Sequence, residues 1–490
     1  MGPQLKEAEL RGRRIQDIIL SPWLWIAGAA LAGLFLGSLS IGPANQRYIK
    51  LGLGLILGYL VLRFPVYISA GIFIIVYTLP TVLWLGNTNI LFLLCLTIVW
   101  VIKYGLRIEA SPKKTFLDWA IFLYILAHLV SVFQMRTGDL DNTVRSLLHL
   151  LSPLLLFYIV VNAARTTKRL ELLAQAFTFS MAFVYFTAIM ERFFHSITYI
   201  PSWYLWGQGS IYGEAQVFRA MGIFRTHGLL SDACALCLIL QIFLVAYYRR
   251  NRFLASYHVV IGIVSMSILM LTGNRGGLLA LAFGLVYMLW IFNKGIKVRH
   301  LVTGALIIGG IILISEWILS AQEGNITLIS RLIATEFNEN YIPDTRKDGW
   351  PAIWELIMQK PIAGHGPYYD LLYYRSIDNH MGWPHNAFLF YFVTIGLFGV
   401  LIYIILLTIL IFKTFPGRGH SMAQASLAKG LAIVFHVNVI QLTIGELRTD
   451  HQRPDVRVIF MWVIYSLAVL AYYLWREERQ SKSPVNLPAK

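Results

Sequence analysis

Apolar runs about twenty residues long recur along most of this 490-residue chain, and they constrain its fold more than any other feature. A helix needs about 20 apolar residues to cross about 30 Å of hydrocarbon. The composition agrees, because 57% of the residues are hydrophobic and only 13% are charged, whereas a soluble domain carries about 25% charged residues. The sequence therefore predicts an all-α, polytopic integral membrane protein with a single membrane domain over residues 1–490.

The runs predict about fourteen spans, with about twelve as the alternative. They begin near residues 18, 48, 65, 87, 116, 146, 170, 227, 254, 275, 300, 386, 425 and 458. The first run is longer than the apolar core of about 7–15 residues in a cleaved signal peptide. We therefore expect it to be retained as the first span.

Lys and Arg residues gather in short loops at alternate ends of successive runs, as at 103–114, 249–252 and 294–299. This is the positive-inside pattern, and it predicts that both termini are cytoplasmic. The net charge of +16 is then a topology signal. Membrane lipids are the expected surroundings, and no nucleic-acid partner is expected.

Two connections on the opposite, outer side are longer than connectors need to be. They cover residues 196–226 and 322–383. The second contains an amphipathic stretch from Trp350 to Met358. Such a helix could lie in the membrane interface with its tryptophans at headgroup depth, or it could form a small lid with its own core. The sequence leaves both readings open.

Outer arginines are the candidates for an anion site. Arg275 lies between two apolar runs and is followed by Gly276. An arginine in such a place usually faces a cavity or a ligand, although it could also extend to lipid headgroups. The other three candidates lie in the long loops: Arg219, Arg225 and Arg346. Because guanidinium groups bind phosphate oxygens in bidentate geometry, these arginines predict a phosphate or diphosphate site.

His385 is the candidate general base. It follows Trp383-Pro384 and precedes Asn386 and a long apolar run. The dipole at a helix N-terminus favours the neutral imidazole, which is the form that accepts a proton. A histidine that merely caps the helix is the alternative.

Several kinds of chemistry find no support in the sequence. It contains no P-loop, no G-x-G-x-x-G unit and no nucleophile elbow. No His, Cys or carboxylate residues stand at metal-ligand spacing. We therefore expect no cofactor, no bound metal and no nucleotide hydrolysis.

The ordered motifs resemble a known family. They are Asn274-Arg275-Gly276 after an apolar run, Arg346 before Trp350, Pro361-x-x-Gly364-x-Gly366, and His385-Asn386 leading into a run with Gly396 and Gly399. In this order, over about residues 215–415, they resemble the O-antigen ligase and polymerase superfamily of bacterial envelope glycosyltransferases. One departure is Asn274, where the family often has serine. Asparagine can still form a hydrogen bond there.

The resemblance implies transfer of a glycan from undecaprenyl diphosphate at the periplasmic face of the bacterial inner membrane, without nucleotide or metal. Carried over residue by residue, it implies that Arg275 and Arg346 bind the diphosphate and that His385 is the base. Arg219 and Arg225 would extend the anion site. Supporting roles would fall to Asn386, Gly276 and Trp350.

Several functions remain open at this point, including transfer of an oligosaccharide to a protein. In a ligase the acceptor would be lipid A-core, and the long second loop favours this reading slightly. In a polymerase the acceptor would be another lipid-linked glycan. An anion transporter is the alternative from another class. Transporters often have repeated halves, and no internal repeat is evident here.

Overall fold

A computed structural model describes most of the chain from residue 61 onward. The described residues are 61–77, 88–135, 140–193, 210–212, 215–217, 220–224, 226–293, five residues between 309 and 317, 345–367, 384–448 and 456–482. Contacts divide the chain into Met1–Pro65 and Val66–Lys490, and the helices below belong to the second unit. The runs near residues 18 and 48, most of the run near 300, and both Arg219 and Arg225 lie outside the described residues.

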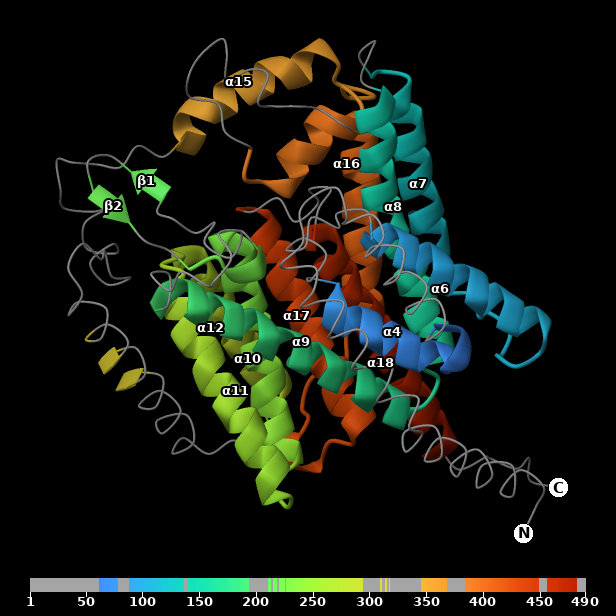
Figure 1. Cartoon of the computed structure of the whole chain (residues 1–490), viewed down its shortest axis with the longest axis vertical. Coiled ribbons are helices and arrows are strands. Elements are labelled where there is room, and N and C mark those ends of the chain that lie inside the picture. The colour runs from blue at the N-terminus through green and yellow to red at the C-terminus, as the bar shows by residue number, and fades with distance from the viewer. Residues whose placement is uncertain are drawn as a thin grey trace, which may run out of the picture. The chain divides into compact units, whose positions relative to one another are not determined.

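Helices form where the apolar runs predicted them (Figure 1). They are α4 (Val66–Val76), α6 (Thr88–Gly105), α7 (Asp118–Val132), α8 (Leu140–Ala163), α9 (Thr167–Phe193), α10 (His227–Tyr247), α11 (Arg252–Leu271), α12 (Arg275–Ile291), α16 (Ala387–Thr414), α17 (Leu427–Glu446) and α18 (Val456–Lys482). Within the described residues, seven helices are long and apolar enough to cross a membrane. The prediction of a polytopic helical membrane protein is confirmed.

Two elements lie inside the predicted long loops. In the first loop, β1 (Ser210–Tyr212) pairs antiparallel with β2 (Ala215–Val217), a small exception to the all-α prediction. In the second loop, α15 (Thr345–Gln359) contains the predicted amphipathic stretch. Figure 1 shows α15 lying across the end of the bundle at which α16 begins.

Helices α10, α17 and α18 form the centre of the bundle, since their side chains are buried on nearly every face. Peripheral helices instead expose apolar side chains, as α11 does with Val259, Val260 and Ile263. A helix that is apolar all round belongs in a core or in a membrane. The exposed apolar faces of the peripheral helices agree with a position in a membrane.

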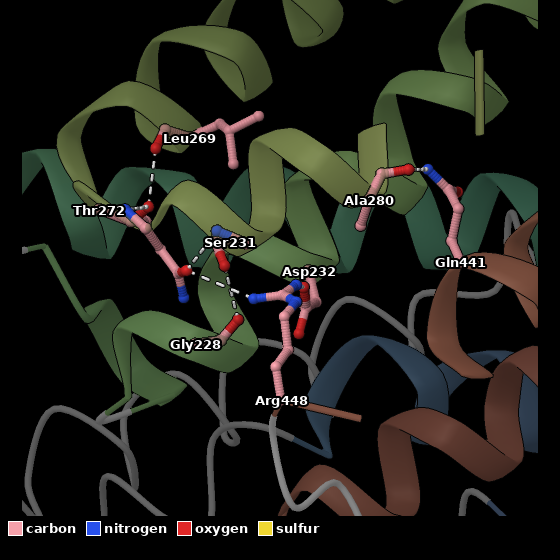
Figure 2. A network of polar contacts seen from close by, with 10 residues as sticks. Gly228, Ser231, Asp232, Leu269, Thr272, Ala280, Gln441 and Arg448 are labelled. Atoms are coloured by element: carbon pink, nitrogen blue, oxygen red, sulfur yellow. Dashed lines mark hydrogen bonds and ion pairs between the residues drawn. The ribbon is translucent and has the colours of Figure 1, made fainter. Parts of the chain in front are cut away.

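Small residues on α12 allow α10 and α17 to approach it closely. A Cβ on Gly277 would lie 2.6 Å from the Cβ of Ser231 on α10. On Gly284 it would lie 2.2 Å from Nε2 of Gln441 on α17. That Nε2 donates to the carbonyl oxygen of Ala280 at 3.0 Å (Figure 2). Such small-residue contacts are typical of helix packing in lipid, and here they hold α12 against both neighbours.

Candidate functional site

Helix α12 begins at Arg275, where the sequence predicted an anion-binding arginine. Asn274 caps the helix, because its side-chain oxygen accepts a hydrogen bond from the Gly276 amide at 3.0 Å. The first turn of a helix carries a partial positive charge and unpaired amides, which favour an anion. Arg275 adds a full positive charge at this point and is half-buried.

Arg448 occupies the space beside Gly276. A Cβ on Gly276 would lie 2.2 Å from Nη1 of Arg448, so only glycine leaves room for the guanidinium. Nη1 donates to the Asn274 side-chain oxygen at 3.3 Å, and Nη2 forms an ion pair with Asp232 of α10 (Figure 2). In the structure, Gly276 makes room for Arg448.

His385 lies at the start of α16, exposed and with a left-handed backbone (φ 49°). That conformation is uncommon outside glycine and often marks functional sites. The next residue, Asn386, caps α16 by accepting from the amides of Phe388 and Leu389 at 2.9 Å and 3.0 Å. The N-terminal cap of α16 is therefore Asn386, not His385.

The end of α17 connects these two helix starts. Leu447 and Arg448 follow the last residue of α17. The carbonyl oxygen of Leu447 accepts a hydrogen bond from the side-chain nitrogen of Asn386 at 3.0 Å, and Arg448 donates to the side-chain oxygen of Asn274. The motif around Arg275 and the motif around His385, far apart in the sequence, therefore meet at the same end of the bundle.

Trp350 of α15 reaches the same region. Its indole N–H donates to the carbonyl oxygen of Pro384 at 3.0 Å, directly before His385. Arg346 belongs to the first turn of α15, but its side chain lies outside the described part of the chain. Next to Arg219, the Ala220 amide donates to the carbonyl oxygen of Leu271 at 3.2 Å, at the end of α11.

Helix α15 packs on α16 through one apolar face. Ile353, Leu356 and Ile357 form a buried cluster with Val393 of α16. The apolar core of α15 is therefore shared with α16, and is not a core of its own. Trp354 nevertheless remains 52% exposed, so α15 also presents a second apolar face.

The turn after α15 fills a break in α16. This helix loses helical geometry at Gly396 (φ 68°). Four backbone bonds join the turn to the break: His365 N to Val393 O at 2.8 Å, Gly366 N to Thr394 O at 3.0 Å, Leu397 N to Pro361 O at 2.8 Å, and Phe398 N to Ile362 O at 3.4 Å. A Cβ on Gly364 would lie 2.5 Å from the carbonyl carbon of Thr394. The glycines of the P-x-x-G-x-G motif thus join α15 to α16.

The comparison with known families covers this site. Residues 260–404 match the family model described as O-antigen ligase. The resemblance is confirmed. The O-antigen ligase match supports an enzyme of the glycosyltransferase type that acts on lipid-linked glycans in a membrane. It includes Arg275, Arg346 and His385. No curated protein matches the chain.

Asp232 and Arg448 lie outside the matched O-antigen ligase range and were not among the residues that the sequence singled out. A signal was present, since Glu446 and Arg448 are charged residues at the end of an apolar run. Glu446 is buried within α17 and accepts a hydrogen bond from the Tyr403 hydroxyl at 2.5 Å. Ionisable residues so close to a membrane interior are usually paired or functional.

Proposed function

We propose that this protein transfers a glycan en bloc from undecaprenyl diphosphate to a sugar hydroxyl of lipid A-core, at the periplasmic face of the inner membrane. One observation supports this above the others. The turns that carry Arg275 and His385 both lie in the matched O-antigen ligase range, and both bond to the end of α17. A group that binds an anion and a group that accepts a proton are thereby brought to one end of the bundle.

The arginines would act on the leaving group. As the bond between the anomeric carbon and the phosphate oxygen breaks, negative charge grows on the diphosphate. Positive charge at the start of α12, with Arg275, and at the start of α15, with Arg346, stabilises the transition state more than the ground state. Arg219 and Arg225 would extend this site along the donor. The proposal therefore needs no metal to balance the leaving charge.

His385 would act on the acceptor. Its neutral imidazole takes the proton of the acceptor hydroxyl while that oxygen attacks the anomeric carbon from the side opposite the diphosphate. A new glycosidic bond forms, undecaprenyl diphosphate leaves, and the anomeric configuration inverts. Asn386 and Trp350 hold the segment on both sides of His385, through Leu447 and Pro384.

The first test is transfer by the protein in proteoliposomes that contain lipid-linked glycan and lipid A-core. General-base catalysis contributes about 10²–10⁴-fold, so His385→Ala should lower the transfer rate by about that factor. His420→Ala is a matched control, because His420 is half-buried and bonds Pro416 and Ile291 at the other end of α12. Full transfer by His385→Ala would exclude His385 as the base.

The O-antigen ligase match is shared with polymerases, so the acceptor needs its own test. Deleting the gene should leave lipid A-core without O-antigen if the protein is the ligase. Core capped with a single repeat unit would instead identify a polymerase. Uptake of a labelled anion at a rate that the lipid-linked donor does not change would indicate a transporter.

A further inference from the structure

A polar network with two residues outside the matched range holds the start of α12. It consists of Asp232, Arg448 and Asn274. We propose that Arg448, fixed by Asp232, is a positioning residue that sets the direction of Arg275 and thereby the use of the donor diphosphate. This inference rests on the proposed function, and it concerns the donor half of that reaction only.

The ion pair is a costly way to join two helices. The side chains of Arg448 and Asp232 are only 16% and 4% exposed. Removing charges from water costs several kcal/mol per ion, so apolar residues of similar volume are often at least as stabilising. A buried ion pair is therefore weak evidence for stability. Its geometry offers a better explanation for its presence.

The guanidinium of Arg448 links three elements with one planar group. One nitrogen pairs with Asp232 on α10 and the other donates to Asn274, while the backbone belongs to the end of α17. The Asn274 oxygen also accepts from the Gly276 amide at 3.0 Å. Arg448 therefore orients the group that caps α12, and Arg275 is the residue between Asn274 and Gly276. A lysine, with a single point charge, cannot make this two-sided contact in the same way.

The acceptor half of the site, around His385, depends less on Arg448. Asn386 is held by two further hydrogen bonds, from Phe388 and Leu389, and Pro384 is held by Trp350. At the start of α12, Asn274 caps the helix with one side-chain oxygen, which Arg448 shares, and its backbone amide donates to the Thr272 hydroxyl at 3.3 Å. Loss of the network should consequently disturb Arg275 more than His385. Donor and acceptor kinetics can separate these effects.

Two variants test the network in different ways. Asp232→Asn removes the charge that fixes Arg448. Asn274→Ser keeps a good helix cap but shortens the side chain that reaches Arg448. Each should raise the KM for the lipid-linked donor about tenfold, the loss expected for one charge-assisted hydrogen bond. The KM for lipid A-core should stay unchanged.

Gly262→Ala is the matched control for a changed packing contact within a span. Its added Cβ would meet only the Cβ of Gln241, at 3.6 Å. The KM for the lipid-linked donor and the KM for lipid A-core should both match those of the wild type. All three variants are assayed as full-length protein in the same proteoliposomes, and the amount of folded protein is normalised by size-exclusion chromatography.

Three results would overturn the inference. A lower donor KM in Asp232→Asn would mean that the freed Arg448 binds the diphosphate itself. A fall in kcat with both KM values unchanged would mean that the network only maintains the fold. Wild-type kinetics in both variants would mean that Arg275 needs no positioning. Failure of the proposed function is distinct, because then the wild type itself transfers no glycan.

Discussion

Two asparagines show how far the contacts of single residues can be predicted from the sequence. Asn274 and Asn386 each precede an apolar run, and asparagine is among the best helix caps. Both do cap a helix in the structure. Their second contacts, with Arg448 and Leu447, were not predictable. Arg448 and Asp232, which form the ion pair, are 216 residues apart. A single sequence holds no signal for such a pairing.

The buried ion pair gives a prediction about stability. Asp232→Ala leaves the Arg448 charge buried without its carboxylate, which typically costs about 3 to 5 kcal/mol. The double variant Asp232→Ala, Arg448→Met removes both charges and should cost less than the single change. Thermal unfolding of the purified protein in detergent measures both. A single variant as stable as the wild type would show that the pair does not hold α10 to the end of α17.

At the scale of elements, α15 and its turn were predicted in outline only. The spacing of apolar residues from Trp350 to Met358 predicted an amphipathic helix, and α15 is one. The sequence did not indicate its partner. The contact with α16 depends on backbone hydrogen bonds around Gly396, and such bonds leave little trace in side-chain patterns apart from the glycines themselves.

The break in α16 predicts a sensitive glycine. Gly396→Ala would place a Cβ 2.1 Å from the carbonyl oxygen of Ile362, at φ 68°. Gly417→Ala is the matched control, because Gly417 has φ 79° but no neighbouring atom within 4 Å of an added Cβ. Left-handed backbone alone costs about 1–3 kcal/mol. Gly396→Ala should therefore lower the unfolding temperature clearly more than Gly417→Ala. Equal losses would argue against the docked turn.

The second face of α15 should contact lipid. Trp354 and Met358 lie one turn apart and are 52% and 61% exposed, and Ile362 in the following turn is 74% exposed. The Ile362 carbonyl bonds the amide of Phe398, an exposed apolar residue on α16. The apolar surface of α15 thus continues into that of a span, as expected for a helix at the membrane interface.

Fluorescence quenching can test this contact. A fluorophore attached to Met358→Cys, in a protein with Cys95→Ser to remove an exposed thiol, should be quenched by brominated lipid. The same fluorophore on Glu355→Cys, an exposed polar position one residue after Trp354, should be quenched less. Equal quenching at both positions would contradict a lipid-facing stripe.

For the whole molecule, the positions of the described helices were predictable because apolar length is a local property. The described helices begin within a few residues of most of the predicted starts. The arrangement was not predictable, including the central position of α10, α17 and α18. The loop around Lys113 and the C-terminal segment around Glu477 were both predicted to be cytoplasmic. Lys113 and Glu477 form an ion pair at 3.1 Å.

The prediction at this scale concerns topology, that is, which side of the membrane each end of the bundle faces. A thiol-reactive, membrane-impermeant label should modify Glu355→Cys in intact spheroplasts, because that exposed polar residue lies at the predicted outer end. Gln480→Cys, exposed near the end of α18, should react only after the membrane is permeabilised. Labelling of Gln480→Cys in intact spheroplasts would reverse the proposed orientation.

The break at Gly396 has a mechanical consequence. Backbone bonds join the turn after α15 to both sides of the break, so α15 and the segment from Ala387 to Ile395 form one rigid piece. That piece begins two residues after His385. Any movement of α15 would therefore also move the segment next to His385.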